Sequence, residues 1–169
     1  RGLAILRRVL GTGVDLRVDA NCAWSVNEAL AALQRFAPFG LSGIEQPVAA
    51  RDIDGLRRLV AATKIAIIVD ESLCSVQDAQ RLANARACDT FNIRVSKCGG
   101  LLNSVRIARI AEQYGLSCIV GAQVGESGIL SAAGRHLAAA IPNVRCVEGS
   151  AGPTALERRP DRRECPARQ

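Results

Sequence analysis

The stretch Ile65-Ala-Ile-Ile-Val-Asp70 is a short run of apolar, mostly β-branched residues that ends in a carboxylate. A run of this length and composition is typical of a buried β-strand. Two similar segments lie upstream, Val14-Asp-Leu-Arg-Val-Asp19 and Gly43-Ile-Glu45, and the three terminal acids are separated by 26 and 25 residues. Three more strand-like segments follow downstream, at Thr90–Val95, Leu116–Val120 and Val144–Glu148. The sequence therefore predicts six strands at nearly regular spacing.

Segments of helical length separate these strands. Ser25-Val-Asn-Glu28 has the capping-box pattern and leads into Ala29–Phe36, and Ser75-Val-Gln-Asp78 is a similar start to Ala79–Ala87. Apolar residues also recur at helical spacing in 3–10, 52–62, 102–114 and 127–140. This alternation predicts an α/β fold with a parallel sheet and right-handed crossovers, either doubly wound or closed as a barrel.

Asp19, Glu45 and Asp70 each end a strand, so a barrel would bring them to the face where βα loops build active sites. Three carboxylates there repel one another unless a cation lies among them, and oxygen ligands without His or Cys favour Mg²⁺. The alternative is that each acid only precedes the N-terminus of a helix. Three acids in register favour the metal site.

Composition limits the other classes of function. The chain has 169 residues, and its 22 basic and 16 acidic side chains give a net charge of +6. The charges are scattered, so we expect no nucleic-acid partner, and no apolar run is long enough to predict a membrane span. Seven cysteines without a C-x-x-C pattern indicate reduced thiols in a cytoplasmic protein and argue against zinc.

Five segments together resemble the enolase superfamily, in its muconate lactonizing enzyme and mandelate racemase subgroups. They lie in order over about residues 1–150, as LRVDANCAWS, GIEQP, VDES, NIRVSKCGG and GAQVGES. The resemblance implies a partial (β/α) TIM-type barrel, about strands three to eight of a (β/α)7β barrel. We expect residues 151–169, which lack periodicity, to form an irregular, disordered tail.

The resemblance implies an isomerase or lyase in which Asp19, Glu45 and Asp70 hold Mg²⁺, with Mn²⁺ as an alternative ion. The enzyme would remove the proton α to the carboxylate of a small molecule and stabilise the enediolate, as in cycloisomerases, dehydratases, racemases and epimerases. A homo-oligomer is expected for the full-length protein. The alternative is a catalytically incompetent barrel fragment that retains metal binding or structural contacts, and we expect this chain alone to have little activity.

The resemblance also identifies candidate catalytic and substrate-binding residues. Arg94 occupies the position of the family's sixth-strand lysine. A guanidinium stays protonated near neutrality and therefore cannot act as a base, although it can bind a carboxylate or stabilise an enediolate. One-base outcomes are therefore favoured over racemisation. Lys97 is either a substitute acid/base, a substrate clamp or a support of the barrel rim. Candidate substrate-binding residues are Asn21, Asn92 and Glu126, for which turn formation, core hydrogen bonding and helix capping are the alternatives.

Overall fold

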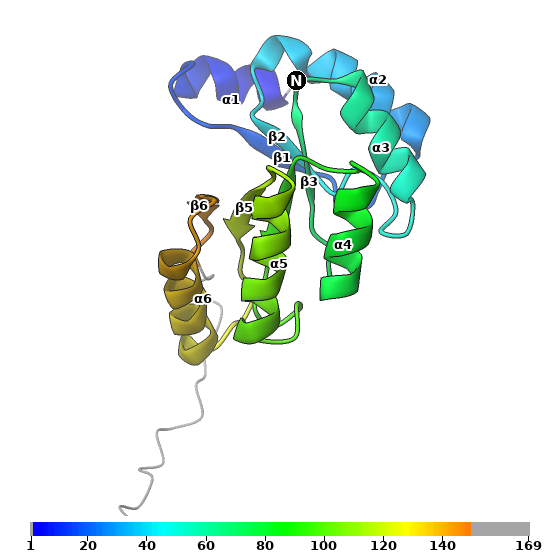
Figure 1. The fold of residues 1–169 in the computed structure, drawn as a ribbon. Helices are drawn as coiled ribbons and strands as arrows, with labels where there is room; N and C mark the ends of the chain where they lie inside the picture. The colour runs from blue at the N-terminus through cyan, green and yellow to red at the C-terminus, as the bar shows by residue number, and fades with distance from the viewer. Residues whose placement is uncertain (1, 150–169) are drawn as a thin grey trace, which may run out of the picture.

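The computed structural model describes residues 2–149, and these form a curled sheet covered by helices (Figure 1). The strands are β1 (Arg17–Asp19), β2 (Gly43–Glu45), β3 (Ala66–Val69), β4 (Thr90–Ile93), β5 (Ser117–Val120) and β6 (Val144–Val147). They pair in chain order and all the pairs are parallel. This partial barrel confirms the predicted fold class. Of the two arrangements that the sequence allowed, the structure has the barrel and not the doubly wound sheet. The tail predicted at 151–169 lies outside the described residues.

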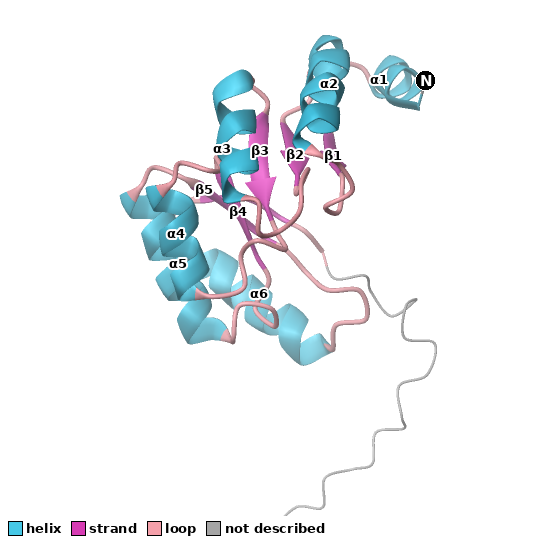
Figure 2. Cartoon of the chain, turned by 90° about the vertical axis from the view of Figure 1, so that its right-hand side faces the viewer, coloured by secondary structure: helices cyan, strands magenta, loops and turns pink. Residues whose placement is uncertain are grey.

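A helix follows each of the first five strands and packs on the outer side of the sheet (Figures 1 and 2). The helices are α1 (Gly2–Leu10), α2 (Val26–Phe36), α3 (Ile53–Ala62), α4 (Val76–Asn84), α5 (Leu101–Gln113) and α6 (Gly128–Ala140), and a 3₁₀ turn, η1 (Ala37–Phe39), follows α2. None of these described helices is long and apolar enough to cross a membrane.

Side-chain caps set the starts of the helices that follow β1 to β3. In the predicted capping box, the Glu28 amide donates to Ser25 Oγ at 3.3 Å and the Ser25 amide donates to Glu28 Oε2 at 2.8 Å. Asp52 accepts from the Gly55 amide, and Ser75 accepts from the Asp78 amide. These caps satisfy amides that the first helical turn leaves without backbone partners, so each chain segment turns from strand to helix within a few residues.

The two sides of the sheet bury different residues. On the outer side, Ile44, Ile67 and Phe91 are fully buried under the helices and belong to the main hydrophobic core. On the inner side, Ile68 and Ile119 form a layer with Arg17, Thr90 and Cys146. Gly43 makes room for this layer, because a Cβ there would lie 2.6 Å from Ile68 Cδ1. The inner layer supports the polar residues at the carboxyl ends of the strands.

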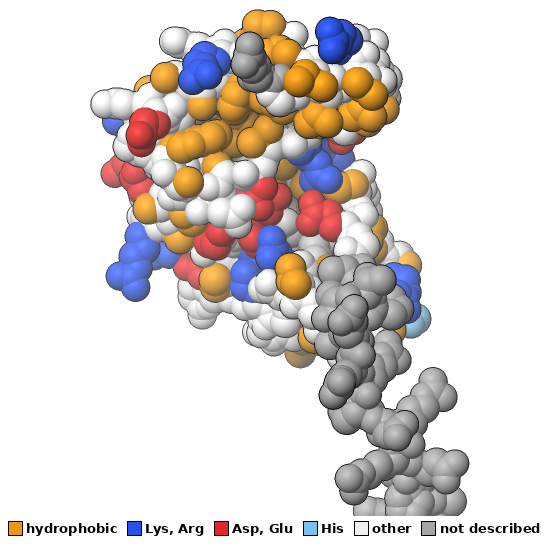
Figure 3. Space-filling model, turned by 180° about the vertical axis from the view of Figure 1, so that it is seen from behind, with side chains coloured by type: hydrophobic (Ala, Val, Ile, Leu, Met, Phe, Trp, Pro, Cys, Tyr) orange, Lys and Arg blue, Asp and Glu red, His pale blue; other side chains and the backbone are white. Residues whose placement is uncertain are grey.

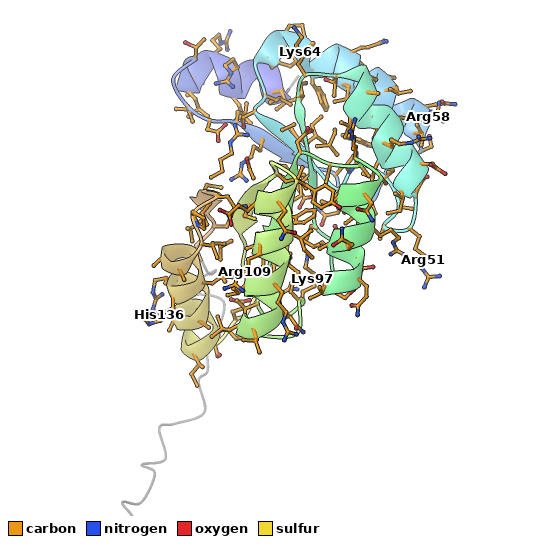
Figure 4. The ribbon with its side chains drawn as sticks, viewed as in Figure 1. Arg51, Arg58, Lys64, Lys97, Arg109 and His136 are labelled. Atoms are coloured by element: carbon orange, nitrogen blue, oxygen red, sulfur yellow. The ribbon has the colours of Figure 1, made fainter. Side chains whose placement is uncertain are left out.

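Charged side chains come from many elements of the fold, and some of them gather on one face. The basic side chains labelled in Figure 4 come from different elements, and His136 is exposed on α6. Figure 3 shows Asp and Glu side chains gathered beside Lys and Arg on the face turned away from α4 and α5. Apolar side chains gather around α1 in the same view, where Ile5, Leu6 and Val9 are exposed.

Candidate active site

The three predicted metal ligands lie at the same end of three neighbouring strands. Asp19 is directly opposite Glu45 in the β1–β2 pair, and Asp70 follows the last residue of β3. Glu45 and Asp70 are only 7% and 3% exposed, whereas Asp19 is exposed. Parallel pairing therefore brings acids from distant parts of the sequence to one edge, as the spacing predicts.

Two cations contact Asp70. Arg94, placed by the end of β4, has its Nη2 2.5 Å from Asp70 Oδ2 and 3.6 Å from Glu45 Oε1. The Lys97 ammonium contacts Asp70 Oδ1 and also donates to the backbone carbonyls of Asp70, at 2.5 Å, and Asn92, at 3.2 Å. An ammonium has three N–H donors, so these contacts engage all of them. The structure brings both predicted catalytic candidates to the carboxylates.

Asn92 is the centre of the buried part of this cluster. Its side chain is completely buried, and its Nδ2 donates to Glu45 Oε1 at 2.7 Å and, at 3.4 Å, to Glu148 Oε2. Glu148, just after β6, in turn pairs with Arg17 on β1 at 3.2 Å. This pair links the first and last described strands across the inner side. We call Asp19, Glu45, Asp70, Asn92, Arg94 and Glu148 the polar rim.

Negative charge in the polar rim changes the acidity of Glu45. Burial, followed by repulsion from Glu148, Asp19 and Asp70, raises the pKa of the Glu45 carboxyl to about 7, although the hydrogen bond from Asn92 opposes this rise. The pKa of Glu45 is therefore raised even though the Arg94 guanidinium lies nearby. A divalent cation beside Glu45 would offset the repulsion from the neighbouring carboxylates and favour the ionised form of Glu45.

The donor set fits Mg²⁺, although the side chains are not gathered for coordination. Among residues 2–149, no three His, Cys, Asp or Glu side chains lie together closely enough to hold a metal ion. Asp70 instead contacts Arg94 and Lys97. The carboxylates are nevertheless hard oxygen donors on adjacent strands, which is the kind of ligand that Mg²⁺ prefers. To bind a metal ion, the Asp70 carboxylate would have to give up its contacts with Arg94 and Lys97 and contact the ion instead.

The other two predicted substrate-binding residues, Asn21 and Glu126, lie in the loops after β1 and β5. Asn21 is exposed in the loop after β1 with a φ of 45°, and its backbone amide donates to Asp19 Oδ1 at 2.9 Å. The observed contact of Asn21 therefore belongs to the turn that follows Asp19. Glu126 accepts a 3.4 Å hydrogen bond from Ser96 and, with Glu148, lines a cavity of about 180 Å³.

Several residues of this region were not predicted from the sequence. Glu148 ends its strand as Asp19, Glu45 and Asp70 do, so its position carried the same signal. Gln123 accepts a hydrogen bond from Arg94 Nη1 at 3.1 Å, and Gly121 leaves the space that the Asn92 side chain occupies. A Cβ on Gly121 would lie 2.2 Å from Asn92 Oδ1. Gly121 and Gln123 lie in the segment GAQVGES that carries the family resemblance, but their contacts depend on residues of the neighbouring strand β4.

Gly121→Ala should destabilise the protein by about 1–3 kcal/mol, because the added methyl group overlaps the buried Asn92 amide. Gly134→Ala is the control, since its Cβ would meet only Val120 Cγ1 at 3.7 Å and alanine favours the interior of α6 by roughly 0.5–1 kcal/mol. Urea denaturation of the two variants checks this. Equal stability of Gly121→Ala and the parent chain would contradict the packing role of Gly121.

Glu45 should make the stability of the chain depend on pH between 4.5 and about 7. In this range the folded state retains a proton on Glu45 that the unfolded state has lost, so the free energy of unfolding decreases as pH rises. Glu45→Gln should remove a contribution on the order of 1.4 kcal/mol for each unit of the pKa shift. Urea denaturation at several pH values checks this, with the exposed Glu112→Gln as the control. An unchanged pH slope in Glu45→Gln would exclude the effect.

Comparison with known proteins places this geometry in a family. Residues 1–168 match the family described as enolase C-terminal domain-like. The chain is 37% identical over 139 residues to the hydrophobic dipeptide epimerase of Enterococcus faecalis, covering 82% of this chain and 39% of the relative. It is 38% identical over 140 residues to the chloromuconate cycloisomerase of Pseudomonas putida, covering 83% of this chain and 37% of the relative. The chain thus spans about two fifths of the length of these relatives.

A solved structure agrees with both sequence matches. The dipeptide epimerase from Enterococcus faecalis V583, complexed with Mg and the dipeptide L-Leu-L-Tyr, superimposes with a TM-score of 0.84 at 35% identity. The match covers 86% of this chain and 41% of that one. The relatives are isomerases, and they include epimerases, racemases and cycloisomerases. Because the family match extends over nearly the whole sequence, the chain belongs to the enolase C-terminal domain-like family, within the mandelate racemase and muconate lactonizing enzyme group.

Proposed function

We propose that this chain carries the metal-binding and charge-stabilising part of an enzyme that abstracts the proton α to the carboxylate of a small substrate. The observation that carries the proposal is the alignment of Asp19, Glu45 and Asp70 at the carboxyl ends of adjacent parallel strands, beside Arg94. An α-proton next to a carboxylate is very weakly acidic, so its removal requires positive charge near the carboxylate oxygens. The polar rim supplies the groups for this task.

Asp19, Glu45 and Asp70 would hold Mg²⁺, with Mn²⁺ as an alternative. The dipeptide epimerase structure described above contains Mg, which supports this assignment. When bound, the ion supplies positive charge that stabilises a substrate carboxylate as its α-proton leaves. The repulsion of Glu45 by Glu148, Asp19 and Asp70 supports the presence of a cation among these carboxylates.

Arg94 and Lys97 would take different roles. Arg94 remains charged and lies at the carboxylates, so it would bind the substrate carboxylate or stabilise the charge of the enediolate. Lys97 could act as a base only if it were neutral and released from Asp70. Its three contacts instead favour a structural role, in which Lys97 supports the polar rim. Asn92 would orient Glu45 through their 2.7 Å hydrogen bond, and Asn21 and Glu126 would contact substrate from the surrounding loops.

The contacts of Lys97 favour a second candidate function, in which the chain binds the cation without catalysing turnover. The sequence contains two lysines, Lys64 and Lys97, and only Lys97 lies at the carboxyl ends of the described strands. Since its N–H donors are engaged, the described residues offer no unengaged lysine at the rim as a base. Metal binding and proton abstraction must therefore be tested separately.

Millimolar Mg²⁺ should raise the melting temperature of the chain, because an ion that binds only the folded state stabilises it. At 100 times the dissociation constant the gain is about 2.7 kcal/mol. Asp70→Asn should abolish the rise, whereas Asp54→Asn, which changes an exposed carboxylate on α3, should retain it. Thermal melts with and without Mg²⁺ check this. A cooperative melt that does not respond to Mg²⁺ would refute the metal site.

Proton abstraction should appear as deuterium exchange at the carbon next to the substrate carboxylate. If the chain alone abstracts a proton, L-Leu-L-Tyr incubated with it and Mg²⁺ in D₂O loses the α-proton signal of its tyrosine residue, and Asp70→Asn prevents this loss. We expect little exchange from the chain alone, because the N–H donors of Lys97 are engaged. Nuclear magnetic resonance measures the exchange directly, and a cis,cis-muconate sample tests the cycloisomerase alternative through loss of the substrate. Metal binding without either reaction would support the second candidate over the enzyme.

A further inference from the structure

Gln46 has an unusual position next to the polar rim. It follows Glu45 directly, is completely buried, and has a φ of 34°, in the left-handed region that residues with side chains seldom adopt. A strained conformation of this kind persists only where the surrounding structure holds it in place. The contacts of Gln46 show what holds it.

The backbone of Gln46 joins the segments on both sides of β2. Its amide donates to the Ile68 carbonyl at 2.8 Å, and its carbonyl accepts from the Cys22 amide at 2.8 Å. Cys22 lies in the loop after Asp19, and Ile68 lies two residues before Asp70. The two backbone bonds therefore connect the segments that carry all three acids.

The side chain of Gln46 is hydrogen-bonded through every donor and acceptor position. Its Oε1 accepts from the amides of Asp70, at 3.0 Å, and Ser72, at 3.1 Å. Its Nε2 donates to the Val48 carbonyl at 3.0 Å and to Ser72 Oγ at 2.8 Å. Ser72 Oγ continues the network by donating to the Ala50 carbonyl. A primary amide can donate twice and accept twice, so the capacity of this side chain is filled.

We propose that Gln46 is a positioning residue that fixes the backbone of Asp70 relative to Glu45 and Asp19, so that the three carboxylates can bind one cation. This inference rests on the proposed function. Gln46 forms none of the observed hydrogen bonds with the carboxylate oxygens themselves, so it acts through the backbone that carries them. Metal–ligand distances in protein sites agree with standard values within about 0.2 Å, and loss of an outer group that orients a ligand typically lowers metal affinity 10–100-fold.

A metal titration with matched variants tests this role. Gln46→Met keeps the approximate shape of the side chain and removes its hydrogen bonds. Asn143→Leu is the control, because the Asn143 amide also bonds two backbone carbonyls, those of Ala108 and Leu116, at the opposite ends of the strands. Mn²⁺ binding to the 169-residue chain is followed by electron paramagnetic resonance, and amide hydrogen exchange is measured at Asp70 and Ser72.

Gln46→Met should weaken Mn²⁺ binding at least 10-fold and accelerate exchange at the Asp70 and Ser72 amides more than elsewhere. Asn143→Leu should lower the melting temperature and leave Mn²⁺ affinity within about twofold of the parent value. Ser72→Ala, which retains the bond from the Asp70 amide to Gln46, should have an intermediate effect on affinity. This variant keeps the inference testable if Gln46→Met does not fold.

The outcomes separate this inference from the proposed function. If the parent chain binds Mn²⁺ and the Gln46 and Ser72 variants bind it as well as Asn143→Leu does, Gln46 has no positioning role and the proposed metal site stands. The positioning role is likewise overturned if only Ser72→Ala folds and its affinity equals that of the control. If the parent chain binds no Mn²⁺, both the metal site and the role of Gln46 are overturned.

Discussion

The site depends on one constraint, the repulsion between carboxylates that the parallel sheet brings to the same edge. The register between β1 and β2 aligns Asp19 with Glu45, and the next strand delivers Asp70 to the same edge. Ionised carboxylates that close together are unfavourable unless positive charge or hydrogen-bond donors accompany them. β4 and the loop after it supply these groups, which are Asn92, Arg94 and Lys97. They offset the negative charge at the ends of the first three strands.

The rim is held by backbone geometry as much as by charge. Gly43 and Gly121 provide space on the inner side where any other side chain would meet Ile68 or Asn92. Gln46 is buried and hydrogen-bonds the backbone at the ends of β1 and β3, although it forms no hydrogen bond with the carboxylate oxygens. Hydrogen bonds that are fully satisfied in a buried network restrain their partners strongly, because breaking one leaves an unpaired polar group away from water. The acids can therefore be close to one another without displacing the strands.

Periodicity in the sequence was sufficient to predict the strands, the helices and the end of the sheet at which the acids meet, because these features depend on local residue patterns. The capping box at Ser25 and the strand before Asp70 are examples. The pairing of Asp70 with two cations, the space beside Gly121 and the contacts of Gln46 depend on residues from different strands. Glu148 could have been predicted from the same pattern, because it too is a carboxylate directly after the last residue of a strand.

The ion pair between Arg17 and Glu148 joins residues separated by 131 positions. Closing so long a loop costs conformational entropy, so a contact over this distance along the chain is favoured once the intervening chain is already ordered. In kinetic terms, we expect the inner side of the sheet to be completed late in folding. The electrostatic environment of Glu45, which includes Glu148, is therefore completed only when the last described strand docks.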